Sequence, residues 1–277
     1  MRSPPRFALN HMTSPRLGVE AFFDLARKLG VYEVEIRNDL GGDVVAGGLP
    51  AARVRALAES AGLSILTINA LQRFNDWNTD REAEAIALVD YAASCGAKAL
   101  VLVPVNDGSG RANGERQGNL RIALKALGSI LKARGVIGLI EPLGFEICSL
   151  RSKREAKDAI SAVGADATFG LVHDTFHHCL AEEPDLFCTA TGLVHISGVS
   201  DPGARVADLR DPHRVLVDGR DRLNNVGQIR SLIEGGYRGP FSFELFAEEV
   251  HRLDDIEAAL IESMAFIRSA LSREAVA

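Results

Sequence analysis

The 277-residue sequence has few cysteines and no long apolar segment. No C-x-x-C pair occurs among its four cysteines, Cys95, Cys148, Cys179 and Cys188, which argues against a disulfide framework or a structural zinc site. No apolar run approaches the roughly 20 residues that a membrane-spanning helix requires. Prolines interrupt the N-terminal segment MRSPPRFALNHMTSP, where a signal peptide needs an unbroken apolar stretch. We therefore expect a cytoplasmic protein with reduced thiols and no membrane partner.

The sequence also lacks an excess of positive charge. Its 31 Lys and Arg residues against 37 Asp and Glu residues give a formal charge of −6, which opposes general binding to nucleic acid. With 47% hydrophobic and 25% charged residues, the composition excludes a disordered chain. No G-x-G-x-x-G follows the first expected strand and no phosphate loop occurs, so an open doubly wound sheet is only the alternative fold.

Short apolar runs rich in β-branched residues alternate with helical patterns along the chain. The expected strands are Phe7–Asn10, Tyr32–Arg37, Ser64–Ala70, Ala99–Val105, Ile137–Leu143, Phe169–Thr175, Leu193–Gly198 and Pro240–Phe246. The expected helices include Ala51–Ala61, Asp80–Cys95, Asn119–Arg134 and Ser152–Val163. Eight alternations of buried strand and helix predict a (β/α)8 TIM barrel. Because no linker divides the chain, we expect a single domain over residues 1–277.

Polar residues stand at the ends of the expected strands, where a barrel of this kind carries its reacting groups. They are Asn10, His11, Glu35, Arg37, Asn69, Asn106, Glu141, Asp174, His195 and Glu244. A buried carboxylate costs several kcal/mol unless it is paired or bound to a metal, and three together would raise one another's pKa. We therefore expect Glu141, Asp174, His195 and Glu244 to hold a divalent ion. This mostly oxygen ligand set suits Mn²⁺, which we favour, as well as Mg²⁺, Co²⁺ or Zn²⁺.

Two segments, EPLGFE and HDTFHH, resemble motifs of the xylose isomerase-like TIM barrel superfamily of sugar and inosose isomerases and epimerases. The resemblance implies that Glu141 and Asp174 bind the metal, and that Glu146 and His177 contact the substrate. It implies His195 and Glu244 as the remaining metal ligands. It also implies a small sugar or polyol as substrate, a place in carbohydrate metabolism such as inositol catabolism, and allows a homodimer.

The resemblance further implies an arginine after the histidine of the seventh strand that holds a substrate oxygen, and Arg205 in SGVSDPGAR is the candidate. Asn69 and Trp77, at and after the third strand, are further candidates for contact with the substrate. The segment VDGRDRLNN, which begins in the long loop Val199–Arg222 and runs past its end, stands where the family usually has Pro-Gly-x-Gly. By strand alternation His173 points away from Asp174 and is expected to be structural, and His178 is expected to be exposed.

The chemistry implied is proton transfer beside a carbonyl through an enediolate, with the metal polarising the oxygens and Glu141 and Glu244 moving the proton. A dehydratase of 2-keto-myo-inositol would use the same groups but expel water. An endonuclease IV-like DNA repair phosphodiesterase would need histidine ligands where Asn69 and Asn106 stand. A non-catalytic sugar-binding barrel is the fourth alternative.

Overall fold

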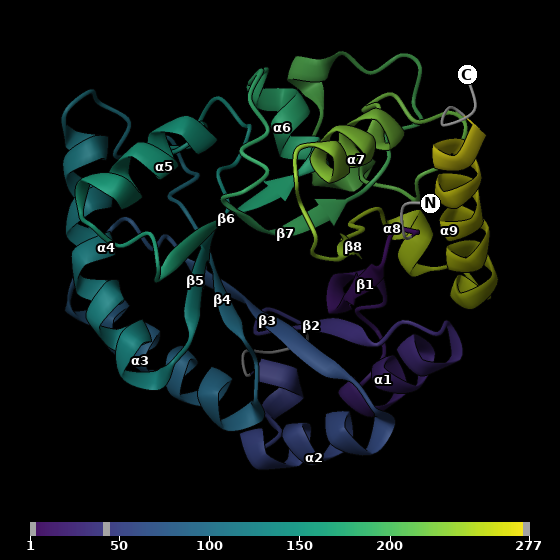
Figure 1. Cartoon of the computed structure of the whole chain (residues 1–277), viewed down its shortest axis with the longest axis horizontal. Coiled ribbons are helices and arrows are strands. Elements are labelled where there is room, and N and C mark those ends of the chain that lie inside the picture. Colours follow the sequence, from purple (N-terminus) through teal and green to yellow (C-terminus); the bar gives the residue numbers. More distant parts are fainter. Residues whose placement is uncertain (1–3, 41–44, 274–277) are drawn as a thin grey trace.

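Within residues 4–40 and 45–273, which this computed structural model describes, eight parallel strands close into a barrel surrounded by helices (Figure 1). Each strand pairs with the next along the chain, and β8 pairs with β1. The strands are β1 Phe7–Asn10, β2 Glu33–Arg37, β3 Ser64–Gln72, β4 Ala99–Val103, β5 Ile137–Ile140, β6 Phe169–Asp174, β7 Thr191–Ile196 and β8 Phe241–Phe243. The predicted (β/α)8 TIM barrel is confirmed. The termini 1–3 and 274–277 and the segment 41–44 of the expected domain lie outside the described residues.

The helices that cover the barrel follow the strands in alternation. They are α1 Val19–Lys28, α2 Ala51–Ala61, α3 Thr79–Cys95, α4 Glu115–Arg134, α5 Lys153–Ala162, α6 Thr175–Ala181, α7 Asn225–Glu234, α8 Glu248–His251 and α9 Ile256–Arg273. The side chain of Ser152 caps α5 by accepting from the N–H of Glu155 at 3.2 Å. Among the described helices, none combines the length and the apolar character needed to cross a membrane.

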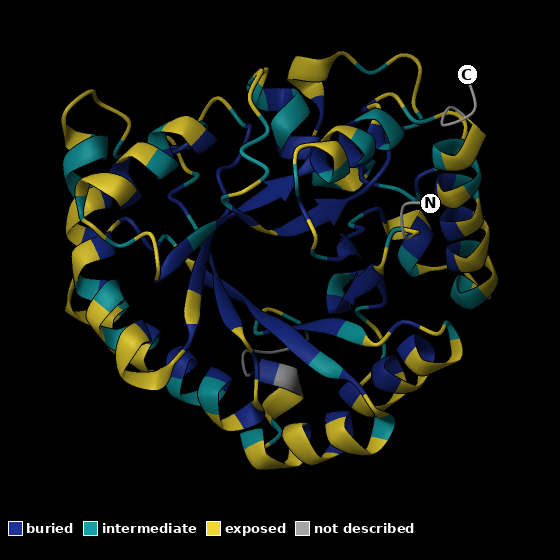
Figure 2. Cartoon of the chain, viewed as in Figure 1, coloured by how far each residue is buried: buried dark blue, intermediate teal, exposed yellow. Residues whose placement is uncertain are grey.

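The strands are buried on both faces, whereas the helices expose their outer sides (Figure 2). A cluster drawn from several strands fills the barrel: Ala8, Leu66, Ala70, Ala99, Val101, Leu139, Val172 and Leu193. Because side chains alternate along a strand, Leu100 and Leu102 of β4 belong instead to the layer between the sheet and the helices. Two residues beyond Leu139, Val172 and Leu193 stand Glu141, Asp174 and His195, so the same alternation directs these polar groups into the barrel mouth.

Five of the expected strands, β4 to β8, end one to three residues earlier than the sequence pattern suggests. In β5 and β8 this places the glutamates just past the strand ends. β5 ends at Ile140 and β8 ends at Phe243. The N–H of Glu141 still donates to Leu102 O at 3.0 Å, and the N–H of Glu244 donates to Ile196 O at 3.1 Å. Each glutamate is therefore held by one further hydrogen bond to the preceding strand while its side chain remains at the barrel mouth.

A polar network links the outer face of β6 to α5 and α6. His173 is fully buried, with Nε2 2.8 Å from Gln228 Oε1 and Nδ1 3.1 Å from Lys153 Nζ. Lys153 Nζ also lies 2.8 Å from His178 Nδ1, and Glu183 accepts from the N–H of Lys153 at 3.0 Å. His173 thus faces the helices as predicted. The expectation for His178 was wrong, because this side chain is half-buried and contacts Lys153.

This network should make the stability of the protein depend on pH. Burial, and then the charge of Lys153, lowers the pKa of His178 from 6.5 to about 4. Between these values the unfolded chain binds a proton that the folded chain does not, so stability falls as the pH drops from 6.5 towards 4. In His178→Gln, the unfolding free energy should fall less steeply, by up to the ~1.4 kcal/mol per pH unit that one proton supplies. Urea denaturation over this pH range measures the slopes, and His213→Gln is the control. Equal slopes for wild type and His178→Gln would contradict the expectation.

Candidate metal centre

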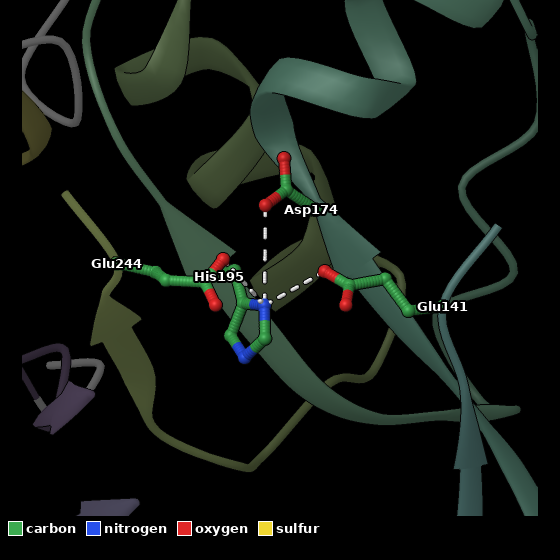
Figure 3. A group of neighbouring side chains, drawn as sticks. All are labelled: Glu141, Asp174, His195 and Glu244. Atoms are coloured by element: carbon green, nitrogen blue, oxygen red, sulfur yellow. Dashed lines mark hydrogen bonds and ion pairs between the residues drawn. The ribbon is translucent and has the colours of Figure 1, made fainter. Parts of the chain in front are cut away.

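Four side chains that the sequence analysis singled out meet at the barrel mouth. Glu141 follows β5, Asp174 ends β6, His195 lies in β7 and Glu244 follows β8. One potential ligand atom from each residue lies within 4.8 Å of the other three, and all four residues are buried. Figure 3 shows the four side chains pointing toward one another from neighbouring strands. The structure therefore brings together the whole set that was expected to hold a metal.

The imidazole of His195 stands at the centre of this group. Its Nδ1 lies 2.9 Å from Glu141 Oε1, 3.3 Å from Glu244 Oε2 and 3.9 Å from Asp174 Oδ2 (Figure 3). Three carboxylates and one imidazole nitrogen form a donor set that divalent ions such as Mn²⁺ or Zn²⁺ accept. The residues present therefore fit a divalent cation, which these four side chains could hold.

The buried charges shift one another's pKa values strongly. Burial alone lowers the pKa of His195, but Glu244, Glu35 and Glu141 raise it well above its ordinary value. Burial alone raises the pKa of Glu244, but the charges of His195 and then Arg214 hold it well below its ordinary range. For Glu141, burial raises the pKa and the attraction of His195 does not offset this effect. The surrounding carboxylates thus favour the protonated imidazole, whose positive charge offsets theirs.

Two buried arginines contact the oxygens of Glu244. Arg214, which is 1% exposed, places Nη2 2.8 Å from Glu244 Oε2 and 2.5 Å from Asp174 Oδ2. Arg37 places Nη1 2.8 Å from Glu244 Oε1. The ring of Phe246 lies 4.6 Å from Cζ of Arg214 and 5.5 Å from Cζ of Arg37. Glu244 is therefore fixed on both oxygens by cationic partners. Arg37 was among the polar strand-end residues expected at the barrel mouth, whereas Arg214 was not.

Arg205 does not reach the cluster. It is exposed and pairs with Asp208 at 2.5 Å within the loop that follows β7. The arginine at the site is Arg214, further along the same loop. After it, Val215 and Gly198 exchange two backbone hydrogen bonds, of 2.7 and 2.9 Å, which return the loop to the end of β7. The apolar run VLV after Arg214 was the only indication of this return in the sequence, and the length of the loop concealed it.

The motif segments EPLGFE and HDTFHH pack against each other. His177 is buried in the first turn of α6, and its Nδ1 accepts from the N–H of Gly144 at 3.3 Å. Gly144 allows this approach, because a Cβ there would lie 2.4 Å from His177 O. The ring of Phe145 meets His177 edge-on at 5.1 Å. Glu146, by contrast, is exposed in the loop after β5 and lies outside the buried cluster.

The two candidates from the third strand lie in different surroundings. Asn69 is buried inside the barrel, and its Nδ2 donates to Glu35 Oε2 at 2.6 Å. Glu35 in turn lies 3.2 Å from Nε2 of His195, so Asn69 is connected to the cluster through Glu35. Trp77 is half-buried and packs against the hydrophobic core near the start of α3.

Metal binding at this centre should depend on pH. An ion must displace the Nδ1 proton of His195, whose pKa the surrounding carboxylates raise, so affinity should increase with pH. The expected slope is about tenfold per pH unit, with about one proton released for each ion bound. Calorimetric titration with Mn²⁺ in buffers of different ionisation enthalpy measures both quantities. Asp208→Asn, in the exposed loop, should retain the wild-type affinity and slope. An affinity that does not change with pH would contradict this expectation.

Comparison with known proteins agrees with this architecture. The family model described as xylose isomerase-like TIM barrel matches residues 23–270. The inosose isomerase of Bacillus velezensis is 27% identical over 197 residues, which cover 68% of this chain and 69% of that protein.

Two solved structures share the fold over nearly the whole chain. A zinc-bound IolI protein is 21% identical, with a TM-score of 0.83 over 97% of this chain and 98% of that chain. A xylose isomerase domain-containing protein of Salmonella typhimurium LT2 is 34% identical, with a TM-score of 0.87 and 99% of each chain covered. Since the family model spans most of the sequence and a relative at this level of identity spans nearly all of it, the chain belongs to the xylose isomerase-like TIM barrel family.

Proposed function

We propose that this protein is a divalent-metal-dependent isomerase or epimerase of a small sugar or keto-inositol. The convergence of Glu141, Asp174, His195 and Glu244 on one point of the barrel mouth is the observation that carries the proposal. Similarity to an inosose isomerase over about two thirds of the chain supports the class of substrate. The donor set makes Mn²⁺ the proposed ion.

When bound, a divalent ion supplies Lewis acidity that polarises the carbonyl and neighbouring hydroxyl oxygens of a substrate. Glu141 and Glu244 lie on either side of His195 Nδ1, at 2.9 and 3.3 Å (Figure 3). In the proposed reaction, one carboxylate removes the proton from the carbon beside the carbonyl. The other returns a proton to the adjacent carbon or to the opposite face.

Arg214 takes the role that the sequence analysis gave to Arg205, that of holding a substrate oxygen. Its Nε donates to Ser197 Oγ at 3.1 Å, and its Nη2 reaches the two carboxylates at the cluster. His177, fixed between Gly144 and the aromatic rings around it, is the second proposed contact for substrate oxygens. The roles of Glu146, Asn69 and Trp77 toward the substrate remain predictions.

We also propose where the reaction takes place and which molecules take part in it. The described cysteines are free thiols, which agrees with a reducing compartment, and we propose a cytoplasmic enzyme of inositol catabolism. Its proposed partner is a small polyol or sugar and not a nucleic acid. A homodimer remains a prediction of the family resemblance.

Glu244→Gln should abolish proton transfer. With Mn²⁺ restored in deuterated water, wild type should introduce deuterium beside the carbonyl of a keto-inositol or a ketohexose. In the variant the rate should fall by about 10²–10⁴-fold, the usual contribution of a general acid–base group. Mass spectrometry of the products and metal analysis of each protein measure the outcome. Glu248→Gln, an exposed change on α8, is the control.

Formation of an unsaturated diketone with loss of water would show a dehydratase in place of an isomerase. Wild-type protein that is loaded with metal but exchanges no proton would contradict both of these functions.

The two arginines of the loop after β7 should differ in their effect on substrate binding. Arg214→Gln removes a charge-assisted hydrogen bond worth about 1.5–3 kcal/mol, so KM should rise about 10- to 150-fold. Arg205→Gln should leave KM within about twofold, since Arg205 contacts only the exposed Asp208 in its ion pair. Steady-state kinetics on both variants, with thermal melts to verify folding, test the assignment. Equal KM values for the two variants would speak against Arg214 as the substrate contact.

A further inference from the structure

A second carboxylate centre lies beneath the proposed metal ligands. Glu35 of β2 is 0% exposed, and both of its oxygens face hydrogen-bond donors from three other strands. Oε1 accepts from Ser242 Oγ at 2.5 Å. Oε2 accepts from Thr67 Oγ1 at 2.6 Å and from Asn69 Nδ2 at 2.6 Å. Burial of an unpaired carboxylate is costly, so this set of donors accounts for part of what keeps Glu35 inside the barrel.

The remaining partner of Glu35 is His195. Nε2 of the imidazole lies 3.2 Å from Glu35 Oε2, whereas Nδ1 of the same ring faces the carboxylates of the proposed metal centre. A neutral imidazole carries its proton on only one nitrogen, and a metal binds the nitrogen without the proton. Because a carboxylate can only accept, Glu35 requires the proton on Nε2 and leaves the Nδ1 lone pair for an ion.

We propose that Glu35 is the positioning residue of the metal centre, which fixes the tautomer and the ring orientation of His195. This inference rests on the proposed metal site but not on the identity of the substrate. Hydrogen-bonded groups behind a ligating histidine raise its strength as a ligand, and their loss typically costs 10- to 100-fold in metal affinity. Glu35 comes from β2, on which none of the four proposed ligands lies. The metal centre therefore also depends on a strand that carries none of its ligands.

The surrounding donors explain why Glu35 can perform this role. Thr67 and Asn69 come from β3, which pairs with β2, and Ser242 comes from β8, which lies beyond β1, so hydrogen bonds from two other strands hold the carboxylate in one orientation. Nδ2 of Asn69 is also 3.2 Å from Thr67 Oγ1, which joins these donors into one network. The endonuclease alternative would have placed a histidine ligand at Asn69. In this chain, that position supports Glu35 instead.

Three variants distinguish a positioning role of Glu35 from a role in packing alone. Glu35→Gln keeps an acceptor for the Nε2 proton but removes the charge, whereas Glu35→Met removes both with little change in volume. Ser263→Ala removes a buried hydrogen bond outside this network, from Ser263 Oγ to Val217 O at 2.7 Å, so it is the control for the loss of a buried polar contact. Zn²⁺ serves as the probe because it is diamagnetic, and its affinity can be measured by calorimetry without any substrate.

We expect affinity for Zn²⁺ to fall about 10-fold in Glu35→Gln and about 100-fold in Glu35→Met, and to stay within about threefold of wild type in Ser263→Ala. Long-range ¹⁵N–¹H spectra of the Zn²⁺-loaded protein should show the His195 proton on Nε2 in wild type and its rapid exchange with water in Glu35→Met. A merely structural role would lower the melting temperature of all three variants without this spectroscopic change.

Three outcomes would overturn different statements. If wild type binds Zn²⁺ tightly and both Glu35 variants bind it as tightly as Ser263→Ala does, the positioning role is wrong and the proposed function stands. If wild type binds neither Zn²⁺ nor Mn²⁺, the proposed function fails and the positioning role fails with it. Binding without any turnover of sugars would leave the role of Glu35 supported while removing the proposed reaction.

Discussion

The crowding of carboxylates inside a closed barrel is the constraint on which the rest of this structure depends. Glu141, Asp174 and Glu244 are buried and approach a single point, where their charges repel one another. The imidazole of His195 and the guanidinium of Arg214 stand among them and reduce this repulsion. Because these carboxylates require positive charge nearby, the site can accept a metal ion. The same requirement explains why His195 and Arg214 are buried in the core.

The barrel itself determines which side chains share that point. Alternation along each strand carries the row formed by Leu139, Val172 and Leu193 upward into Glu141, Asp174 and His195. The apolar residues that fill the barrel and the polar residues at its mouth are therefore successive layers of side chains from the same strands. Closure between β1 and β8 then brings the last strand beside the first, so that Asn10 of β1 donates to Glu244 at 3.2 Å.

Much of this could be predicted from the sequence, because the strand period and the strand-end carboxylates are local patterns. The contacts of Arg37 and Glu35 could not, since their partners Glu244 and His195 lie about 160–210 positions away, across the closed sheet. Arg214 was missed for a different reason. Its position depends on where a long loop turns back, and the short apolar run VLV after Arg214 is too weak a pattern to predict that turn.

The backbone bridge between Gly198 and Val215 allows the loop after β7 to vary in length. Its two hydrogen bonds hold the base of the loop, and a Cβ at Gly198 would lie 2.6 Å from Leu216 O, so the two backbones run in close contact there. Residues added or removed in the mostly exposed stretch between Asp201 and Asp208 would change the outer rim of the barrel, while the bridge still holds the chain that follows Arg214. Changes in the length of this loop can therefore alter the entrance to the barrel while the guanidinium of Arg214 stays at the site.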